Sequence, residues 1–211
     1  PTELHYYGGQ GRAQQIRYAL CEGGIEWEDA CAPFPAPSDV KAKWLELGKN
    51  TTTNVPMLVM DGRAYTQSSA VLRLVARKGG LMPTDLDQQY EVDNILAAVE
   101  DYRAQAYKVI FGEPDAAKIA HLKDTALPQH FTNLERLLGA DDYFVANTFS
   151  VADLGVFDIL TNFSFNMLPS VKASFPKLVA FAARVAARPK MAAYLESPKY
   201  TALFAFPNLE E

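Results

Sequence analysis

The spacing of apolar residues changes once along this chain, near residue 80, and that change limits the folds open to it. Before it, short segments typical of strands alternate with segments of helical period; after it, apolar residues recur only at helical spacing. A chain of 211 residues can form one large core or two small ones. We therefore expect a first domain over residues 1–80, a linker over 81–85 and an all-helical domain over 86–211.

The first domain is predicted to be an α+β unit with the element order βαβαββα. Strand character is expected in four segments, at 4–6, 25–30, 55–60 and 63–66. The last two flank Asp61-Gly62, a dipeptide that favours a tight hairpin turn. Helical patterns cover 12–21 and 68–77, each followed by a pair of glycines, and a less regular pattern covers 40–47.

The second domain is predicted to be a helical bundle that opens with one long helix. Along that helix Val92, Leu96 and Val99 form an apolar stripe beside a more polar one that contains Asp101. Further helices are expected at 118–138, 150–165, 175–187 and 190–195. Ser150-Val-Ala-Asp153 has the pattern of a capping box, in which each end residue accepts a hydrogen bond from the backbone of the other. Its role is therefore structural.

Charge and cysteine content exclude several classes of partner. The chain holds 20 Lys and Arg against 25 Asp and Glu, and this acidic balance disfavours nucleic acid and anionic membranes. No apolar run reaches the roughly 18 to 20 residues of a membrane helix, and the first residues lack an export signal. Cys21 and Cys31 form no metal-ligand spacing with the histidines. We expect a soluble cytoplasmic protein without a bound metal.

Six short segments, in this order and spacing, resemble the cytosolic glutathione transferases along the whole chain. They are Tyr6-Tyr-Gly-Gly-Gln-Gly-Arg12, Asn54-Val-Pro-Met57, Gln67-Ser68, Glu100-Asp101, Ser150-Val-Ala-Asp153 and Ala187-Arg-Pro-Lys190. The resemblance is to the tyrosine-type classes, and it is closest to the sigma class. It implies a thioredoxin-like first domain, a helical second domain, a homodimer, and glutathione as co-substrate.

By this resemblance, Tyr6 is the residue that stabilises the glutathione thiolate. The thiol pKa of about 8.5 leaves it mostly protonated at neutral pH, so a hydroxyl that donates to the charged sulfur favours the nucleophile. Tyr6 and Tyr7 both end the first strand and must point to opposite faces. The family pattern selects Tyr6, six residues before Arg12, and makes Arg12 a nearby positive group.

The resemblance also implies how glutathione is held. Val55-Pro56 is expected to be a cis peptide whose backbone pairs with the tripeptide, next to Asn54. Gln67-Ser68 at a helix start would bind the γ-glutamyl carboxylate. Trp44 with Lys49, or alternatively Lys43, would bind the glycine carboxylate. Asp101 of the partner subunit would reach the γ-glutamyl amine.

The electrophile pocket implied by the resemblance is lined by Tyr7, Gly9, Phe111 and Phe204. Two positions depart from the family pattern: Gln10 stands where arginine is usual, and Thr52 where several classes insert an aromatic residue into the partner. Two other functions stay open at this point. The protein could be a glutathione-dependent isomerase of the prostaglandin-synthase type, or a non-catalytic, crystallin-like or ligand-binding member.

Overall fold

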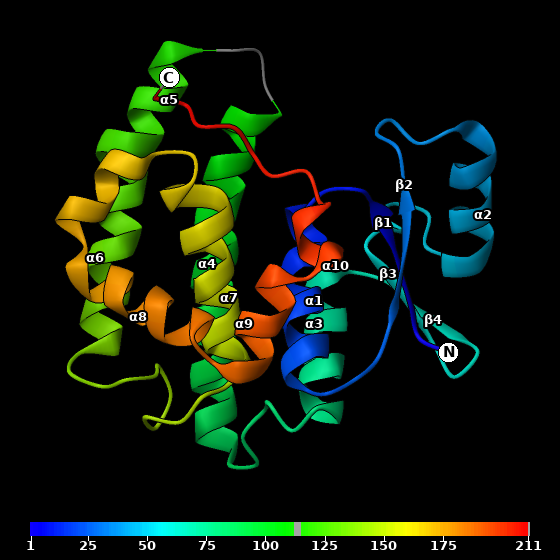
Figure 1. Cartoon of the computed structure of the whole chain (residues 1–211), viewed down its shortest axis with the longest axis horizontal. Helices are drawn as coiled ribbons and strands as arrows, with labels where there is room; N and C mark the ends of the chain where they lie inside the picture. Colours follow the sequence, from blue (N-terminus) through cyan, green and yellow to red (C-terminus); the bar gives the residue numbers. More distant parts are fainter. Residues whose placement is uncertain (112–114, 211) are drawn as a thin grey trace. The chain divides into compact units, whose positions relative to one another are not determined.

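The computed structural model describes residues 1–111 and 115–210, and the chain forms two compact units (Figure 1). The first unit contains Pro1–Met82 together with Pro189–Ala205, and the second contains Pro83–Arg188 and Phe206–Glu211. Residues 189–205 thus pack with the first unit, although in the sequence they follow the long helical region.

The first unit is built around a four-stranded mixed sheet in the order β2-β1-β3-β4. Its strands are β1 (Glu3–Tyr7), β2 (Glu28–Ala32), β3 (Met57–Met60) and β4 (Arg63–Tyr65). Strand β1 pairs in parallel with β2 and antiparallel with β3, and β3 and β4 form the hairpin around the predicted turn. Its first three helices are α1 (Gln14–Glu22), α2 (Ser38–Gly48) and α3 (Ser68–Lys78). The predicted order βαβαββα and the thioredoxin-like fold are confirmed.

Helices α1 and α3 lie side by side on one face of the sheet, and α2 lies on the other (Figure 1). Two short helices from the end of the chain, α9 (Pro189–Glu196) and α10 (Pro198–Thr201), complete the unit, and α9 packs against α1. There the Tyr194 ring meets Tyr18 edge-on, at 6.0 Å between ring centroids. The Tyr194 hydroxyl also accepts a hydrogen bond from Gln14 Nε2 at 3.3 Å.

The second strand was expected at 25–30 and instead covers Glu28–Ala32. Pairing decides the bounds, because Glu3 lies opposite Glu28 and Tyr7 opposite Ala32. Ile25, which has the β-branched side chain typical of strands, instead donates its backbone amide to Leu20 O at the end of α1.

The second unit is helical, as predicted. Its elements are α4 (Leu86–Ile110), α5 (Ala116–His121), a π-helical turn (Leu122–Ala126), α6 (Leu127–Leu138), α7 (Val151–Leu160), a second π-helical turn (Thr161–Phe165), a 3₁₀ helix (Pro169–Ser174) and α8 (Pro176–Ala186). Helices α4 and α7 pack together at its centre. Between them Arg103 Nη1 contacts Asp158 Oδ2 at 2.5 Å, and both side chains are fully buried.

Two segments predicted as single helices contain π-helical turns, for identifiable reasons. In 118–138, Pro128 has no amide hydrogen to donate to the preceding turn, and the π turn Leu122–Ala126 lies just before it. In 150–165, Ser164 Oγ donates to Ile159 O at 2.7 Å, so a side chain satisfies a carbonyl that the regular ladder would use.

Within the described residues, every helix is too short or too polar to cross a bilayer. The same residues contain no cluster of three or more His, Cys, Asp or Glu side chains arranged as metal ligands.

Candidate functional site

Tyr6 and Tyr7 are neighbours at the end of β1, and their rings meet edge-on at 5.3 Å between centroids. Tyr7 packs against the apolar cluster of Ala32, Ala36, Trp44 and Met57 on the side of α2. The hydroxyl of Tyr6 instead reaches the start of the α1 region, where it accepts a hydrogen bond from the Arg12 backbone amide at 3.2 Å. The two neighbouring tyrosines therefore serve different surroundings.

The Tyr6 hydroxyl is arranged as a hydrogen-bond donor. It makes no second hydrogen bond to the described residues, so its own proton is available to a ligand. Burial raises the pKa of Tyr6, and the Arg12 amide and the positive charges of Arg17 and Arg12 oppose that rise without cancelling it. The phenol consequently stays protonated at neutral pH and can donate to an anion.

Gly11 makes room for this hydroxyl. Its φ of +40° lies in the left-handed region, and a Cβ at this position would stand 2.6 Å from Tyr6 Oη. Only glycine satisfies both conditions without strain. Gly11, the third glycine of the turn, therefore allows the backbone to pass close to the Tyr6 hydroxyl.

The start of α3 is a second polar part of the site. Gln67, the residue before the helix, has φ 70° and ψ 105°, an uncommon conformation for a residue other than glycine. Its carbonyl accepts hydrogen bonds from the amides of Ala70 and Val71, and in the described structure no side chain caps this end. Ser68 begins the helix, where the helix dipole and unsatisfied amides favour an anion.

The segment before β3 has the expected backbone form. The Val55–Pro56 peptide is cis, and a second cis peptide, which the sequence did not indicate, joins Phe34 and Pro35. Asn54 closes the preceding loop, because its Oδ1 accepts from Asn50 N at 3.1 Å and its Nδ2 donates to Asn50 O at 2.6 Å. The side chain of Asn54 is thus engaged within the protein.

The residues predicted for the glycine end of glutathione lie on or next to α2. Trp44 is buried in the apolar cluster, with its ring edge-on to Tyr7 at 5.5 Å between centroids. Lys49 is exposed at the C-cap of α2, where its φ is 50°, and Lys43 is exposed one residue before Trp44. Because both lysine side chains are exposed, either could reach a ligand.

Three of the four residues predicted for the electrophile pocket belong to the first unit. Gly9 and Phe204, far apart in sequence, form a parallel bridge, with Gln10 N donating to Phe204 O at 3.0 Å and Phe204 N donating to Gly8 O at 2.9 Å. Tyr7 lies edge-on to the exposed ring of Phe34, at 5.0 Å between centroids. Phe34 extends this apolar surface and was not predicted.

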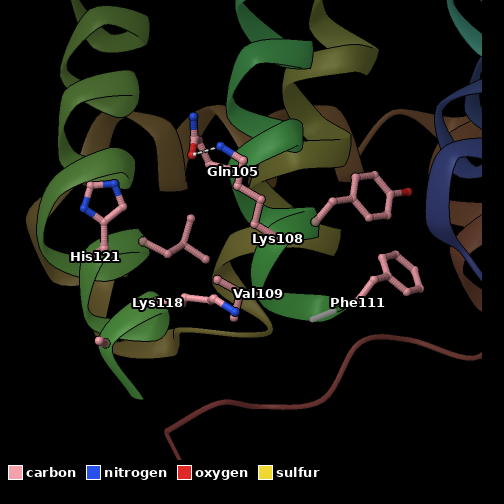
Figure 2. A pocket seen from close by; sticks show the side chains of 9 residues that line it. Gln105, Lys108, Val109, Phe111, Lys118 and His121 are labelled. Atoms are coloured by element: carbon pink, nitrogen blue, oxygen red, sulfur yellow. Dashed lines mark hydrogen bonds between the residues drawn. The ribbon is translucent and has the colours of Figure 1, made fainter. Parts of the chain in front are cut away.

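Asp101 belongs to α4 in the second unit, and Phe111 is the residue directly after that helix. Phe111 stacks on Tyr107 at 5.0 Å between centroids, and both line a cavity of about 540 Å³ between α4 and the α5 region. Figure 2 shows Phe111 pointing to the side of α4 away from His121. Asp101 is exposed, and its charge works against the lowering of the His130 pKa that burial causes.

Arg17 is the residue of this region that sequence reasoning missed. It is completely buried, and its Nη1 donates to Gly9 O at 2.9 Å while its Nε donates to Asp29 Oδ1 at 2.8 Å. A charged residue beside an apolar helical stripe normally predicts a solvent-facing position. The only available signal was the opposite charge of Asp29 in the adjoining strand segment.

Comparisons with known proteins show the family of the chain. Residues 2–77 match the family model described as glutathione S-transferase, N-terminal domain, and residues 100–198 match glutathione S-transferase, C-terminal domain. Glutathione S-transferase A2 of Bos taurus is 31% identical over 92% of this chain and 87% of its own length. Glutathione S-transferase P of Bos taurus is 30% identical over 95% of this chain and 94% of its own length. Glutathione S-transferase alpha-5 of Rattus norvegicus is 29% identical over 92% of this chain and 87% of its own length. The chain belongs to the glutathione S-transferase family.

Proposed function

We propose that this protein conjugates glutathione to hydrophobic electrophiles and that Tyr6 stabilises the attacking thiolate. The observation that carries the proposal is the hydrogen bonding of the Tyr6 hydroxyl. It accepts a hydrogen bond from the Arg12 amide, and its own proton remains available to a ligand. A hydrogen bond to a charged group contributes about 1.5–3 kcal/mol, which corresponds to a lowering of the thiol pKa by about 1 to 2. Arg12 adds positive charge at the same place.

The polar groups around Tyr6 fit a tripeptide with two carboxylates. We assign the γ-glutamyl carboxylate to Gln67 and Ser68, because that helix start offers amides and a positive dipole end. Val55, next to the cis Pro56, would pair its backbone with the extended peptide, and Asn54 would hold the adjoining loop. Trp44 and Lys49 would bind the glycine carboxylate, with Lys43 as the rival cation. Asp101 of the partner subunit would pair with the γ-glutamyl amine.

In the reaction, the sulfur forms a bond to the electrophilic carbon, and the leaving group takes the bonding electron pair with it. Tyr6 donates a hydrogen bond to the sulfur while the thiolate charge is present, and it keeps its own proton throughout. That hydrogen bond weakens as the neutral thioether forms. Tyr7, Gly9, Phe111 and Phe204 would line the side on which the electrophile binds, where aromatic rings favour apolar substrates.

We further propose a cytoplasmic homodimer of the tyrosine type, with features of the sigma class. The dimer is supported by a row of exposed residues on α4 that contains Leu86, Tyr90 and Asp101. The sigma assignment is supported by Thr52, a small polar residue in an exposed loop. A lock-and-key contact would need an inserted aromatic side chain at that position. Thr52 is held by Asn50 Oδ1, which accepts from both its amide and its hydroxyl at 2.9 Å.

Replacing Tyr6 by Phe tests the proposed mechanism. We expect kcat/KM with an aryl halide at neutral pH to fall about 10- to 100-fold, because one hydrogen bond to the thiolate is lost. The dissociation constant for glutathione should change little, since the hydroxyl acts on the sulfur alone. The pH profile should move upward, because the bound thiol then ionises at higher pH.

Tyr7→Phe is the matched control, since it removes a hydroxyl from the adjacent residue, which packs against the apolar cluster and receives no hydrogen bond from the Arg12 amide. A full loss of activity in Tyr7→Phe with normal activity in Tyr6→Phe would show that the wrong tyrosine has been assigned. Wild-type protein that neither binds glutathione nor turns over an aryl halide would contradict the proposed function as a whole.

A further inference from the structure

We propose that Arg17 is a positioning residue for the transfer reaction: it fixes the turn that carries the Arg12 amide to Tyr6, and it provides a permanent positive charge behind the thiolate site. The inference rests on the proposed function, because it assigns to Arg17 an effect on the sulfur that Tyr6 contacts. Arg17 makes no hydrogen bond to the Tyr6 hydroxyl among the described contacts, so its effect is indirect.

The first support is the set of contacts that Arg17 makes. Its guanidinium links three parts of the first unit: Nη1 donates to Gly9 O at 2.9 Å and to Gln14 Oε1 at 3.4 Å, and Nε donates to Asp29 Oδ1 at 2.8 Å. Asp29 is itself held, because Trp27 Nε1 donates to its other oxygen at 3.1 Å. Arg17 thereby ties the glycine turn to both α1 and β2.

The position of this tie determines its consequence. The carbonyl of Gly9 lies two residues before Gly11, which passes over Tyr6 Oη, and three before Arg12, whose amide donates to that oxygen. The Gln10 carbonyl also faces Nη1, at 3.5 Å. Holding these carbonyls therefore holds the backbone that orients the Tyr6 hydroxyl.

The second support is the charge of Arg17 and its burial. The side chain has 0% exposure, and its ion-pair partner Asp29 retains 13%. The remaining nitrogen, Nη2, is buried and has no hydrogen-bond partner among the described residues. A cation in such surroundings is screened much less than one at the surface. Its charge lowers the pKa of Tyr6, Cys31 and Tyr194 against the larger effect of burial.

The charged groups around Tyr6 and Arg17 determine the sign of the effect. Arg17 and Arg12 act on Tyr6 as positive charges, Tyr7 acts in the opposite sense, and Asp29 is the negative group paired with Arg17. Other titratable groups that interact with Arg17 are Cys31 and Tyr194. A net positive charge favours the thiolate over the thiol. Removing Arg17 should thus raise the thiol pKa, and removing only the charge of Asp29 should lower it.

The test compares three changes at this ion pair, Arg17→Met/Asp29→Asn, Arg17→Lys and Asp29→Asn, with a change at an ion pair elsewhere. The double variant Arg17→Met/Asp29→Asn removes the cation without leaving an unpaired buried carboxylate. Arg17→Lys keeps the positive charge but loses the planar guanidinium and its several N–H donors. Arg103→Met/Asp158→Asn removes a fully buried ion pair from the second unit. For each we would measure the pKa of bound glutathione from thiolate absorbance against pH, the dissociation constant of glutathione, and the melting temperature.

We expect the Arg17→Met/Asp29→Asn variant to raise the bound thiol pKa by about 0.5 to 1, which lowers kcat/KM at neutral pH about 3- to 10-fold. Asp29→Asn alone should lower the thiol pKa, and Arg17→Lys should restore at least half of the change. Arg103→Met/Asp158→Asn should lower the melting temperature without moving the thiol pKa.

An unchanged thiol pKa in the folded Arg17→Met/Asp29→Asn variant would overturn the inference, leaving Arg17 a structural residue. If that variant fails to fold, an unchanged thiol pKa in Asp29→Asn would overturn the inference equally. A wild-type thiol pKa equal to that of free glutathione would instead contradict the proposed role of Tyr6, so the two failures are distinct.

Discussion

At the scale of single residues, the position of the Tyr6 hydroxyl depends on the main chain more than on side-chain packing. Gly11 gives the clearest test, because a Cβ there would stand 2.6 Å from Tyr6 Oη. We expect Gly11→Ala to lower kcat/KM about 10-fold or more, since displacing the hydroxyl weakens a hydrogen bond worth about 1.5–3 kcal/mol. The added methyl group also strains a residue with φ +40°. Steady-state kinetics with glutathione as the varied substrate would measure the loss.

Gly8→Ala is the control for this variant. Gly8 lies in the same turn, but a Cβ there would meet nothing within 4 Å, and its φ lies outside the left-handed range. It should therefore keep near-normal activity. Equal losses in both variants would mean that the turn tolerates no side chain at all and that the contact with Tyr6 is not the reason.

The sequence pattern pointed to Tyr6 as a candidate but not to Arg17 or Phe34, and the reason is physical. A tyrosine at the end of a strand beside a glycine turn belongs to a local pattern, and alternation within one strand separates it from Tyr7. Arg17 acquires its role from Asp29 in another element and from the turn carbonyls, which only folding brings together. Phe34 likewise depends on the path of the loop that places it against Tyr7.

At the scale of elements, the capping box at the start of α7 is the local motif with the largest expected effect on stability. Asp153 accepts hydrogen bonds from the amides of Ser150, at 2.8 Å, and Phe144, at 3.0 Å, and it is buried. Asp153→Ala would leave two buried amides unsatisfied, at about 1–3 kcal/mol each. We expect a loss of about 2–4 kcal/mol in the free energy of unfolding, measured by urea denaturation.

Asp85→Ala provides the comparison, because Asp85 caps α4 through one exposed hydrogen bond, from Gln88 N at 3.0 Å. Its loss should cost about 0.5–1 kcal/mol. If the two variants lost similar amounts, burial would not be what makes the Asp153 box important. Neither substitution touches Tyr6 or the start of α3, so the folded fraction of each should keep its glutathione affinity.

Element order was predictable because strands and helices carry different apolar periods, whereas several boundaries were not. The β2 strand begins at Glu28 because that residue pairs with Glu3, a relation between distant segments. The return of 189–205 to the first unit was hidden for the same reason. A helical period predicts a helix but does not say which core its apolar face, here with Tyr194 against Tyr18, will join.

At the scale of the whole molecule, helix α4 carries an exposed stripe that suits contact with a second copy of the chain. Leu86 and Tyr90 are 79% and 69% exposed. The exposed residues Leu86, Tyr90, Ala97 and Asp101 are separated by four, seven and four positions, so they lie on the same side of the helix. Large apolar side chains in such a row are typical of a protein interface. The same face therefore combines apolar anchors with the carboxylate proposed to reach the partner's glutathione.

This combination predicts that assembly and glutathione affinity change together. Tyr90→Asp should convert the proposed dimer to a monomer, as measured by sedimentation, because it would place a charge within the proposed apolar contact. Asp101→Asn should stay dimeric but bind glutathione about 10- to 100-fold more weakly, since a charge-assisted hydrogen bond of about 1.5–3 kcal/mol is lost. The Tyr90→Asp monomer should show a similar weakening, because its site lacks Asp101 of the partner subunit. Leu45→Asp, at an exposed position on α2, should change the oligomeric state far less. A monomer that binds glutathione as tightly as the wild-type dimer would show that Asp101 does not act across the interface.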